Sequence, residues 1–527
     1  MHRRDFVISM FAAGAWTSPF ARQSTQSKRT FDLLTAGISD IQAVVASGAL
    51  SYERIVELYL NRFQAFDKNG PRLNAVLQVN PRALEIARSL DEERRTKGLR
   101  SPLHGITVAV KDSIDVADMP SASGSLAFEG TRPAHDATVV KKLREAGAII
   151  FLKTNLDEFN FGAEGLSSVG GQVLNPYDLK RNPGGSSAGT GVAINVGYAT
   201  VGLGTETGAS VRSPASNNSL VGVVPTTGLV GRAGVLLVSY TQDRVGVHAK
   251  SVADAASMLT VMRGFDAEDL FTWESLDKVD AKPYNDHLAG ASLRGQRIGV
   301  LRGLFRRGEQ FASINALIEK EIDLIRQQGA ILVDGLNTDM DLIAFFPFAR
   351  VGMNEFRQAL EGYLKRRGPD SPIKNLDDLV ASGRYLKDLE NSLKNIQRLP
   401  PPEHNSEYLA RLKNRQMLRE LMVGLMDKHR VDVLVYPFKS MPAPPLGTSD
   451  RGPRDNPISA ITGLPAIVMP AGVNDEGLPF AIEFLGRPYT EHILFRIAAA
   501  YETVSRRRVA PKLTPNLQGE VVEYQAM

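Results

Sequence analysis

The sequence predicts an α/β protein built as one large domain, and three observations lead to that fold class. From residue 104 onward, short apolar runs typical of buried strands alternate with helical stretches, which indicates a sheet connected by crossover helices. Similar runs follow a mostly helical stretch late in the chain, so one sheet takes residues from both sides of it. With 527 residues, 43% of them hydrophobic, the chain can bury a large core.

The individual elements follow from periodicity and from helix and turn signals. Residues 38–95 have a mostly helical pattern, in which Ser51 is a suitable helix N-cap. Strands are expected at 106–110, 148–152, 199–203, 296–301, 433–436, 466–469 and 480–484, and further helices at 138–146 and 314–328. The segment from about 340 to 430 is helical and charged, with a triple proline at 400–402, and indicates a helical insertion on one edge of the sheet.

Composition and charge argue against several function classes. The 62 basic and 58 acidic residues leave a dispersed net charge of +4, which gives no support to a nucleic-acid or membrane-surface partner. The sequence has no cysteine, so disulfides, thiolate nucleophiles and zinc–thiolate sites are excluded. The eight histidines are scattered without ligand spacing, and neither a metal nor another cofactor is expected.

The N-terminal segment 1–27 predicts an export signal and linker. Arg3 and Arg4 precede a moderately apolar stretch, as in a twin-arginine signal that sends folded proteins out of the bacterial cytoplasm. A basic tail without function is the alternative. Pro19 interrupts a run already shorter than a bilayer span, so a removable signal is favoured over stable membrane insertion. We therefore expect a periplasmic or secreted protein, with residues 28–527 as the folded domain.

Two lysines end predicted strands and are candidate bases. Lys111 ends the run HGITVAVK and Lys153 ends AIIFLK. Most lysines at strand ends are solvated, but burial in a cleft disfavours the ammonium and lowers the pKa toward neutrality. Strand position alone does not distinguish the two lysines.

A loop rich in small residues makes Ser210 a candidate nucleophile. Residues 199–203 predict a strand, 204–209 a tight loop, and a helix could begin at Val211. Small residues before a serine allow consecutive backbone N–H groups to face one pocket and to hold an oxyanion. The structural alternative is that Ser210 merely caps the helix.

Two other motif interpretations are weaker. Residues 185–189 match the GxSxG nucleophile elbow, with Ser187 as nucleophile, but the preceding residues DLKRNP do not form the buried strand that the elbow requires. A late histidine on a loop is also missing, because His492 lies in a helical stretch. Neither glycine-rich stretch matches a phosphate-binding motif in a strand-loop-helix frame.

From about residue 35 to 505, the chain resembles the amidase signature family. Its most specific motifs are GITVAVKDSIDV, FLKTNLDEF, LNPYDLKRNPGGSSAG, GLGTETGASVRSPAS, NPISAITGLPAIVMPAG and GLPFAIEFLGRP, in that order. The resemblance implies a central mixed sheet covered by helices on both faces. It also implies hydrolysis of an amide through a seryl acyl-enzyme. The segments GTET and LNPY additionally resemble peptide-amidase-like members, and the predicted N-terminal signal makes this an exported one.

The resemblance assigns roles to single residues. It makes Ser210 the nucleophile, Ser186 the bridging serine and Lys111 the base, with a cis peptide bond entering Ser186. It further implies an oxyanion hole from the backbone of Thr207, Gly208, Ala209 and Ser210, and supporting positions at Ser187, Arg212 and Asp243.

The chain departs from the family pattern at several positions. The family's usual glycine before the nucleophile is Ala209, which fits only if that residue does not need a positive φ. The usual aspartate after the loop threonine is Glu206, GGSSGG has become GGSSAG at Ala188, and a usual Gly-Pro reads Gly246-Val247.

Two alternatives to a stand-alone amidase stay open. One is an activity like that of the glutaminase subunit of the glutamyl-tRNA amidotransferase, which supplies ammonia to partner subunits in the cytoplasm. The other is an inactive binding protein on the same fold. The expected partner is a small-molecule or peptide amide, and the oligomeric state, monomer or homodimer, is not fixed by the sequence.

Overall fold

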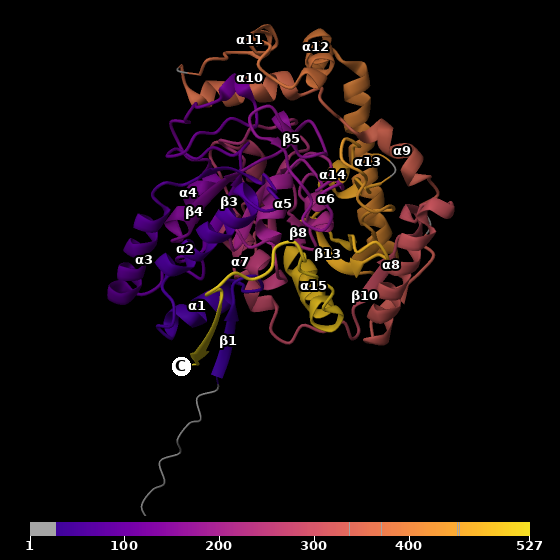
Figure 1. Ribbon diagram of the computed structural model, residues 1–527. Helices are drawn as coiled ribbons and strands as arrows, with labels where there is room; N and C mark the ends of the chain where they lie inside the picture. The colour runs from indigo at the N-terminus through magenta and orange to yellow at the C-terminus, as the bar shows by residue number, and fades with distance from the viewer. Residues whose placement is uncertain (1–27, 337, 370, 451, 453, 527) are drawn as a thin grey trace, which may run out of the picture.

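The computed structural model of the protein describes residues 28–526, apart from 337, 370, 451 and 453. The predicted export signal at 1–27 lies outside the described residues. Strand β1 (Lys28–Asp32) pairs antiparallel with β15 (Val521–Gln525), so the two ends of the described chain meet at the bottom of the molecule in Figure 1. A second small ribbon joins β5 (Leu166–Ser167) to β6 (Gly171–Gln172).

An 11-stranded mixed sheet runs through the described part of the molecule. In spatial order its strands are β11 (Ile331–Val333), β10 (Arg297–Val300), β12 (Val433–Pro437), β14 (Pro479–Leu485), β13 (Ala466–Val473), β8 (Val221–Val224), β9 (Arg244–Ala249), β7 (Val201–Glu206), β3 (Thr107–Lys111), β4 (Ile149–Thr154) and β2 (Val76–Val79). Strands from both sides of the long helical segment contribute to this one sheet. The predicted single α/β domain is confirmed.

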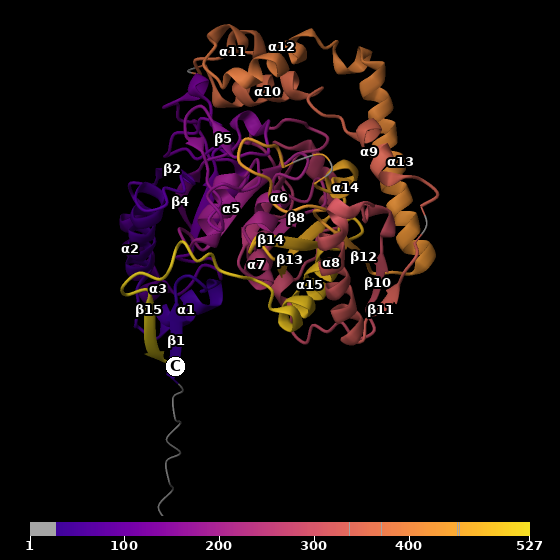
Figure 2. The same cartoon turned by 45° about the vertical axis from the view of Figure 1, so that its right-hand side comes forward.

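Helices cover both faces of the sheet (Figures 1 and 2). They are α1 (Ile38–Ala46), α2 (Tyr52–Phe63), α3 (Ala83–Lys97), α4 (Thr138–Glu145), α5 (Ala188–Asn195), α6 (Arg212–Asn217), α7 (Val252–Met262), α8 (Glu309–Gln327), α14 (Ile458–Thr462) and α15 (Glu491–Ser505). Helices α5 and α6 contact each other and the middle strands, while α15 contacts both α7 and α8. Within the described residues, no helix combines the length and the apolar character needed to cross a bilayer.

The segment expected to be a helical insertion contains α9 (Leu342–Ala349), α10 (Phe356–Arg367), α11 (Leu376–Ser382), α12 (Glu390–Arg398) and α13 (Ser406–His429). In both views α10, α11 and α12 lie together at the top, and the long α13 descends beside α9. Buried polar groups attach α10 to the body of the protein. Tyr363 donates to Asp115 Oδ1 at 2.7 Å, and Arg367 donates to the Ser121 carbonyl at 2.9 Å.

The order of strands brings the C-terminal ends of three strands to one edge of the sheet. Strand β3 runs parallel to both β7 and β4, because crossover segments with helices connect them. All residues of β3 are buried, as expected for a strand with helices on both sides. The C-terminal ends of these strands, Lys111, Thr154 and Glu206, therefore lie along the same edge.

The predicted elements differ from the structure at several places, among them strands β8, β9 and β11, which were not predicted. Strand β2 lies inside the stretch 38–95 expected to be helical, because its four residues are too few to show a period and pairing with β4 stabilises them. Residues 204–206, expected in a loop, extend β7 by pairing with Gly246, Val245 and Arg244 of β9. Helix α6 begins at Arg212, one residue later than expected. The Ser51 N-cap is confirmed, since its Oγ accepts from Arg54 N at 3.0 Å.

Candidate active site

Lys111 places its amine in a buried, hydroxyl-lined position at the end of β3. Its Nζ donates to Ser186 Oγ at 2.7 Å and to Thr205 Oγ1 at 2.9 Å. Thr205 belongs to the adjacent strand β7, so the lysine reaches across to its neighbour. The side chain is fully buried, and burial disfavours the charged form of an amine. This environment suits an amine that takes up and returns a proton.

Lys153, the other candidate, lies in a different set of contacts. Its Nζ donates to the Ile114 carbonyl and to Ser121 Oγ, and it lies 3.4 Å from Asp112 Oδ1. Burial lowers the pKa of Lys153, while the nearby Asp112 opposes that shift. Among the described residues, Lys153 contacts neither Ser186 nor Ser210. The structure thus brings Lys111, and not Lys153, to Ser186.

The loop that carries Ser186 packs tightly against the segment that carries Ser210. The Gly185–Ser186 peptide bond is cis, as the resemblance implied. Gly184 has φ +83°, and a Cβ there would lie 2.7 Å from the Pro214 nitrogen, so glycine permits this close backbone approach. Ser187 N donates to the Ser210 carbonyl at 3.1 Å. The two serine loops are therefore held together by their backbones.

Ser187 faces the backbone of β7. Its Oγ lies 3.3 Å from both the nitrogen and the carbonyl oxygen of Thr205. Helix α5 follows directly, beginning at Ala188. Ser187 thus links the start of α5 to strand β7. This arrangement fits a supporting role better than the role of a nucleophile.

The Ser210 hydroxyl is buried and, among the described residues, has no hydrogen-bond partner. The N-cap position of α6 is Val211, so Ser210 does not cap that helix with its side chain. The capping alternative is therefore excluded. The Ser210 hydroxyl is thus not engaged by another group of the described residues, a feature that it shares with other buried serines such as Ser123 and Ser216.

The turn 207–210 connects β7 to α6 and is held by Glu206. Glu206 Oε2 accepts from Val211 N at 3.0 Å and from Arg212 N at 3.2 Å. Ala209 does not have a positive φ, so alanine replaces the family's usual glycine without backbone strain. Both departures from the family pattern fit the local geometry.

Arg212 connects this turn to the sheet through a buried ionic network. Its guanidinium contacts Glu206 Oε1 at 2.8 Å and both carboxylate oxygens of Glu483 at 2.8 and 2.9 Å. It also donates to the Gly208 carbonyl at 2.7 Å. Burial alone would lower the pKa of Arg212, but Glu206 and Glu483 raise it, so the cation is retained. Arg244 adds a contact of 3.3 Å to Glu206.

A cavity of about 90 Å³ opens beside the turn. It is lined by Asn160, Phe161, Thr207, Gly208, Ala209, Val238, Gln242, Arg350, Gly352, Met353 and Asp455. The lining combines the turn before Ser210 with residues between α9 and α10. A substrate in this cavity would touch both the sheet edge and the helical segment.

Asp243 and His248 lie close to this turn, and each side chain already has a backbone hydrogen-bond partner. Asp243 Oδ2 accepts from Val238 N, and burial raises the pKa of Asp243 to about 6 although Thr207 and backbone N–H groups oppose the shift. His248 Nε2 lies 2.9 Å from the Val211 carbonyl. Burial lowers the pKa of His248 to about 3, so this histidine is neutral. No motif in the sequence pointed to His248.

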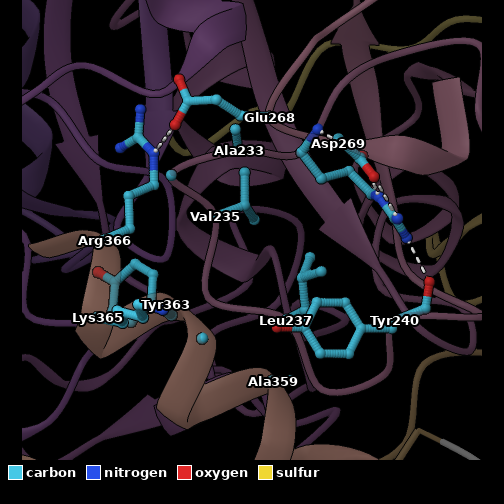
Figure 3. A pocket seen from close by; sticks show the side chains of 13 residues that line it. Ala233, Val235, Leu237, Tyr240, Glu268, Asp269, Ala359, Tyr363, Lys365 and Arg366 are labelled. Carbon is cyan, nitrogen blue, oxygen red and sulfur yellow. Dashed lines mark hydrogen bonds and ion pairs between the residues drawn. The ribbon is translucent and has the colours of Figure 1, made fainter.

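A second cavity, of about 490 Å³, lies between α10 and the segments 232–240 and 268–269 (Figure 3). Its lining does not include Lys111, Ser186 or Ser210. Its charged groups are largely paired with each other, as Arg366 is with Glu268 at 3.0 Å. The smaller cavity differs from it in bordering residues 207–209, which directly precede Ser210. Among the described residues, no group of three or more His, Asp or Glu side chains could hold a metal ion.

Comparison with known proteins extends over most of the chain. The amidase family matches residues 54–495. A probable amidase of Arabidopsis thaliana is 32% identical over 501 residues, which are 92% of each chain. One subunit of the glutamyl-tRNA(Gln) amidotransferase of Chloroflexus aggregans is 31% identical over 482 residues, 89% of this chain and 96% of the subunit. The X-ray structure of the native peptide amidase from Stenotrophomonas maltophilia has a TM-score of 0.81 and 34% identity, and covers 94% of this chain and 100% of that one.

The fold and these similarities define the class of protein as an amidohydrolase. The chain belongs to the amidase family, and the resemblance seen in its motifs is confirmed at the level of the family.

The Arg212 network generates a test of stability. Substitution Arg212→Met would leave Glu206 and Glu483 buried without their main cation. Breaking such a buried pair costs about 3–5 kcal/mol. We expect a decrease of that size in the free energy of unfolding measured by urea denaturation. The control Arg82→Met removes an exposed pair with Glu85, which solvent screens, and should leave the free energy of unfolding nearly unchanged. Equal, small effects of both substitutions would contradict the role given to Arg212.

Proposed function

We propose that this chain hydrolyses a carboxylic amide through an acyl-enzyme on Ser210, with Ser186 and Lys111 as a proton relay. The main observation is the buried 2.7 Å hydrogen bond from Lys111 Nζ to Ser186 Oγ. The loop that carries Ser186 is in turn hydrogen-bonded, through Ser187 N, to the Ser210 carbonyl. A serine hydroxyl is a weak nucleophile until a base takes its proton. An uncharged lysine serves as that base in known Ser-Lys variants of the catalytic triad.

The reaction proceeds by one relay used in both directions. Ser210 gives its proton to Ser186 Oγ, while Ser186 gives its own proton to the amine of Lys111. The Ser210 oxygen bonds to the amide carbon, and the carbonyl oxygen takes up the negative charge. The protonated lysine returns a proton through Ser186 to the leaving nitrogen as the C–N bond breaks. Water then attacks the ester on Ser210, assisted by the same relay, and releases the acid.

Backbone N–H groups of Thr207, Gly208, Ala209 and Ser210 supply the oxyanion hole. Within the described part of the chain, none of these four N–H groups has a hydrogen-bond acceptor, and the first three of these residues line the cavity. Fixed donors directed at a developing oxyanion lower the barrier without reorganisation at the moment of reaction. The backbone around these N–H groups is stabilised by hydrogen bonds from or to the side chains of Ser187, Arg212 and Asp243.

For the substrate, we propose a peptide or small-molecule amide cleaved by a stand-alone enzyme. The similarity to the peptide amidase over its whole length supports this choice. The similarity to a component of the tRNA amidotransferase keeps ammonia transfer as the second candidate. The twin-arginine pattern at Arg3 and Arg4 favours the first, because an enzyme acting on tRNA has no substrate outside the cytoplasm. Cell fractionation distinguishes them: a periplasmic or secreted protein supports export, and a strictly cytoplasmic one favours the amidotransferase role.

The proposed roles predict a large loss of activity in single variants. Ser210→Ala, Ser186→Ala and Lys111→Met should each lower kcat/KM on an amide substrate panel by at least about 10³-fold, because the three act as a unit. The matched control is Ser216→Ala in α6, which removes another buried hydroxyl that has no partner among the described residues and should retain activity.

Activity that survives in Ser210→Ala would overturn the assignment of the nucleophile. A fluorophosphonate probe separates an active enzyme from an inactive binding protein. An adduct on Ser210 of the folded wild-type protein is expected, and its absence would favour the inactive alternative.

A further inference from the structure

Gln242 lies next to the candidate oxyanion hole. Its side chain is buried and lines the cavity of about 90 Å³ together with Thr207, Gly208 and Ala209. Its Nε2 donates to the carbonyl of Thr207. We propose that Gln242 is a positioning residue that sets the orientation of the Thr207–Gly208 peptide, so that Gly208 N–H faces the reacting oxygen. This inference rests on the proposed function.

Every carbonyl of the turn is held by a specific donor. Gln242 Nε2 binds the Thr207 carbonyl, and Arg212 Nη2 binds the Gly208 carbonyl at 2.7 Å. The Ala209 carbonyl accepts from Ser213 N at 2.7 Å, and the Ser210 carbonyl accepts from Ser187 N at 3.1 Å. Of these four donors, Gln242 and Arg212 are the side chains, so they are the ones that a substitution can remove.

Because each peptide unit is planar, the donors that fix these carbonyls also fix the direction of the N–H groups in the same peptides. In a trans peptide, the C=O of one residue and the N–H of the next point to opposite sides. Among the described residues, the only cis bond is Gly185–Ser186, so the peptides of the turn are trans. A carbonyl bound to Gln242 therefore turns Gly208 N–H away from Gln242 Nε2, and a carbonyl bound to Arg212 turns Ala209 N–H away from the guanidinium.

The backbone beside Gln242 is anchored by two of the helices between residues 342 and 429. Thr241 N and Oγ1 donate to Glu355, at the start of α10, at 2.9 and 2.7 Å. Arg415 of α13 donates to the Thr241 carbonyl at 2.8 Å. On the other side, Arg232 donates to the Asp243 carbonyl at 3.1 Å. Gln242 is thus held at a fixed position between the helical segment and the turn.

The test compares the full-length wild-type protein with Gln242→Met, which keeps the length of the side chain but removes the donor. The substrate is a peptide amide that the wild type hydrolyses, and the probe is a dipeptide aldehyde, whose adduct with Ser210 places an oxyanion in the hole. Removing one oxyanion donor outright costs about 10²–10³ in kcat, so misorienting one should lower kcat roughly 10- to 100-fold. KM should change less than about threefold, because the amide ground state carries no such charge.

The inhibition constant of the aldehyde should rise by about the same factor as kcat falls. A role in stability alone would lower the melting temperature without this parallel change. The matched control is Gln42→Met in α1, whose Nε2 also donates to backbone carbonyls, at 2.7 and 3.1 Å, and which should leave kcat and aldehyde binding unchanged.

If Gln242→Met does not fold, Gln242→Glu serves instead, because an ionised carboxylate cannot donate to the Thr207 carbonyl. Either folded variant with wild-type kcat and wild-type aldehyde affinity would overturn the inference. A wild-type protein that hydrolyses no amide would instead contradict the proposed function, so the two failures are distinguishable.

Discussion

The hydrogen bond between Lys111 and Ser186 in a water-poor interior is the interaction on which the site depends. In the proposed relay the amine of Lys111 is the base, and that role requires a site that withholds the solvation an ammonium receives in water. This placement requires β3 and β7 to be parallel neighbours, because Thr205 of β7 is the second partner of Lys111. It also requires the loop of Ser186 to pack on the segment of Ser210, which the hydrogen bond from Ser187 N secures.

Beneath Ser210, buried charged side chains hold the turn in place. Burying ions is unfavourable unless the ions are paired and hydrogen-bonded. Arg212 meets that condition, with Glu206 on one side and Glu483 on the other. Its Nη2 donates to the Gly208 carbonyl. One side chain therefore links the stability of the sheet edge to the direction of the backbone N–H groups that would receive an oxyanion.

The sequence predicted the α/β class and most central strands because their apolar runs are long and clearly bounded. It did not distinguish Lys111 from Lys153 on its own, since each ends such a run. The register explains why: Val110 pairs with Lys153 and Lys111 with Thr154, so the two lysines occupy successive positions and point to opposite faces. Only the pairing of strands reveals this. No pattern in the sequence indicated Gln242, because its proposed positioning role depends on a contact with the carbonyl of Thr207, which is distant in the sequence.

Locating the acyl group on the enzyme tests the central claim most directly. An activated ester of a peptide acid is mixed with the protein, the reaction is quenched with acid, and the tryptic peptide 182–212 is fragmented by mass spectrometry. This peptide contains Ser186, Ser187 and Ser210, and cleavages between 188 and 209 separate the first two from the third. We predict that the acyl mass lies on Ser210. An acyl group on Ser186 or Ser187, or no covalent intermediate during turnover, would contradict the account.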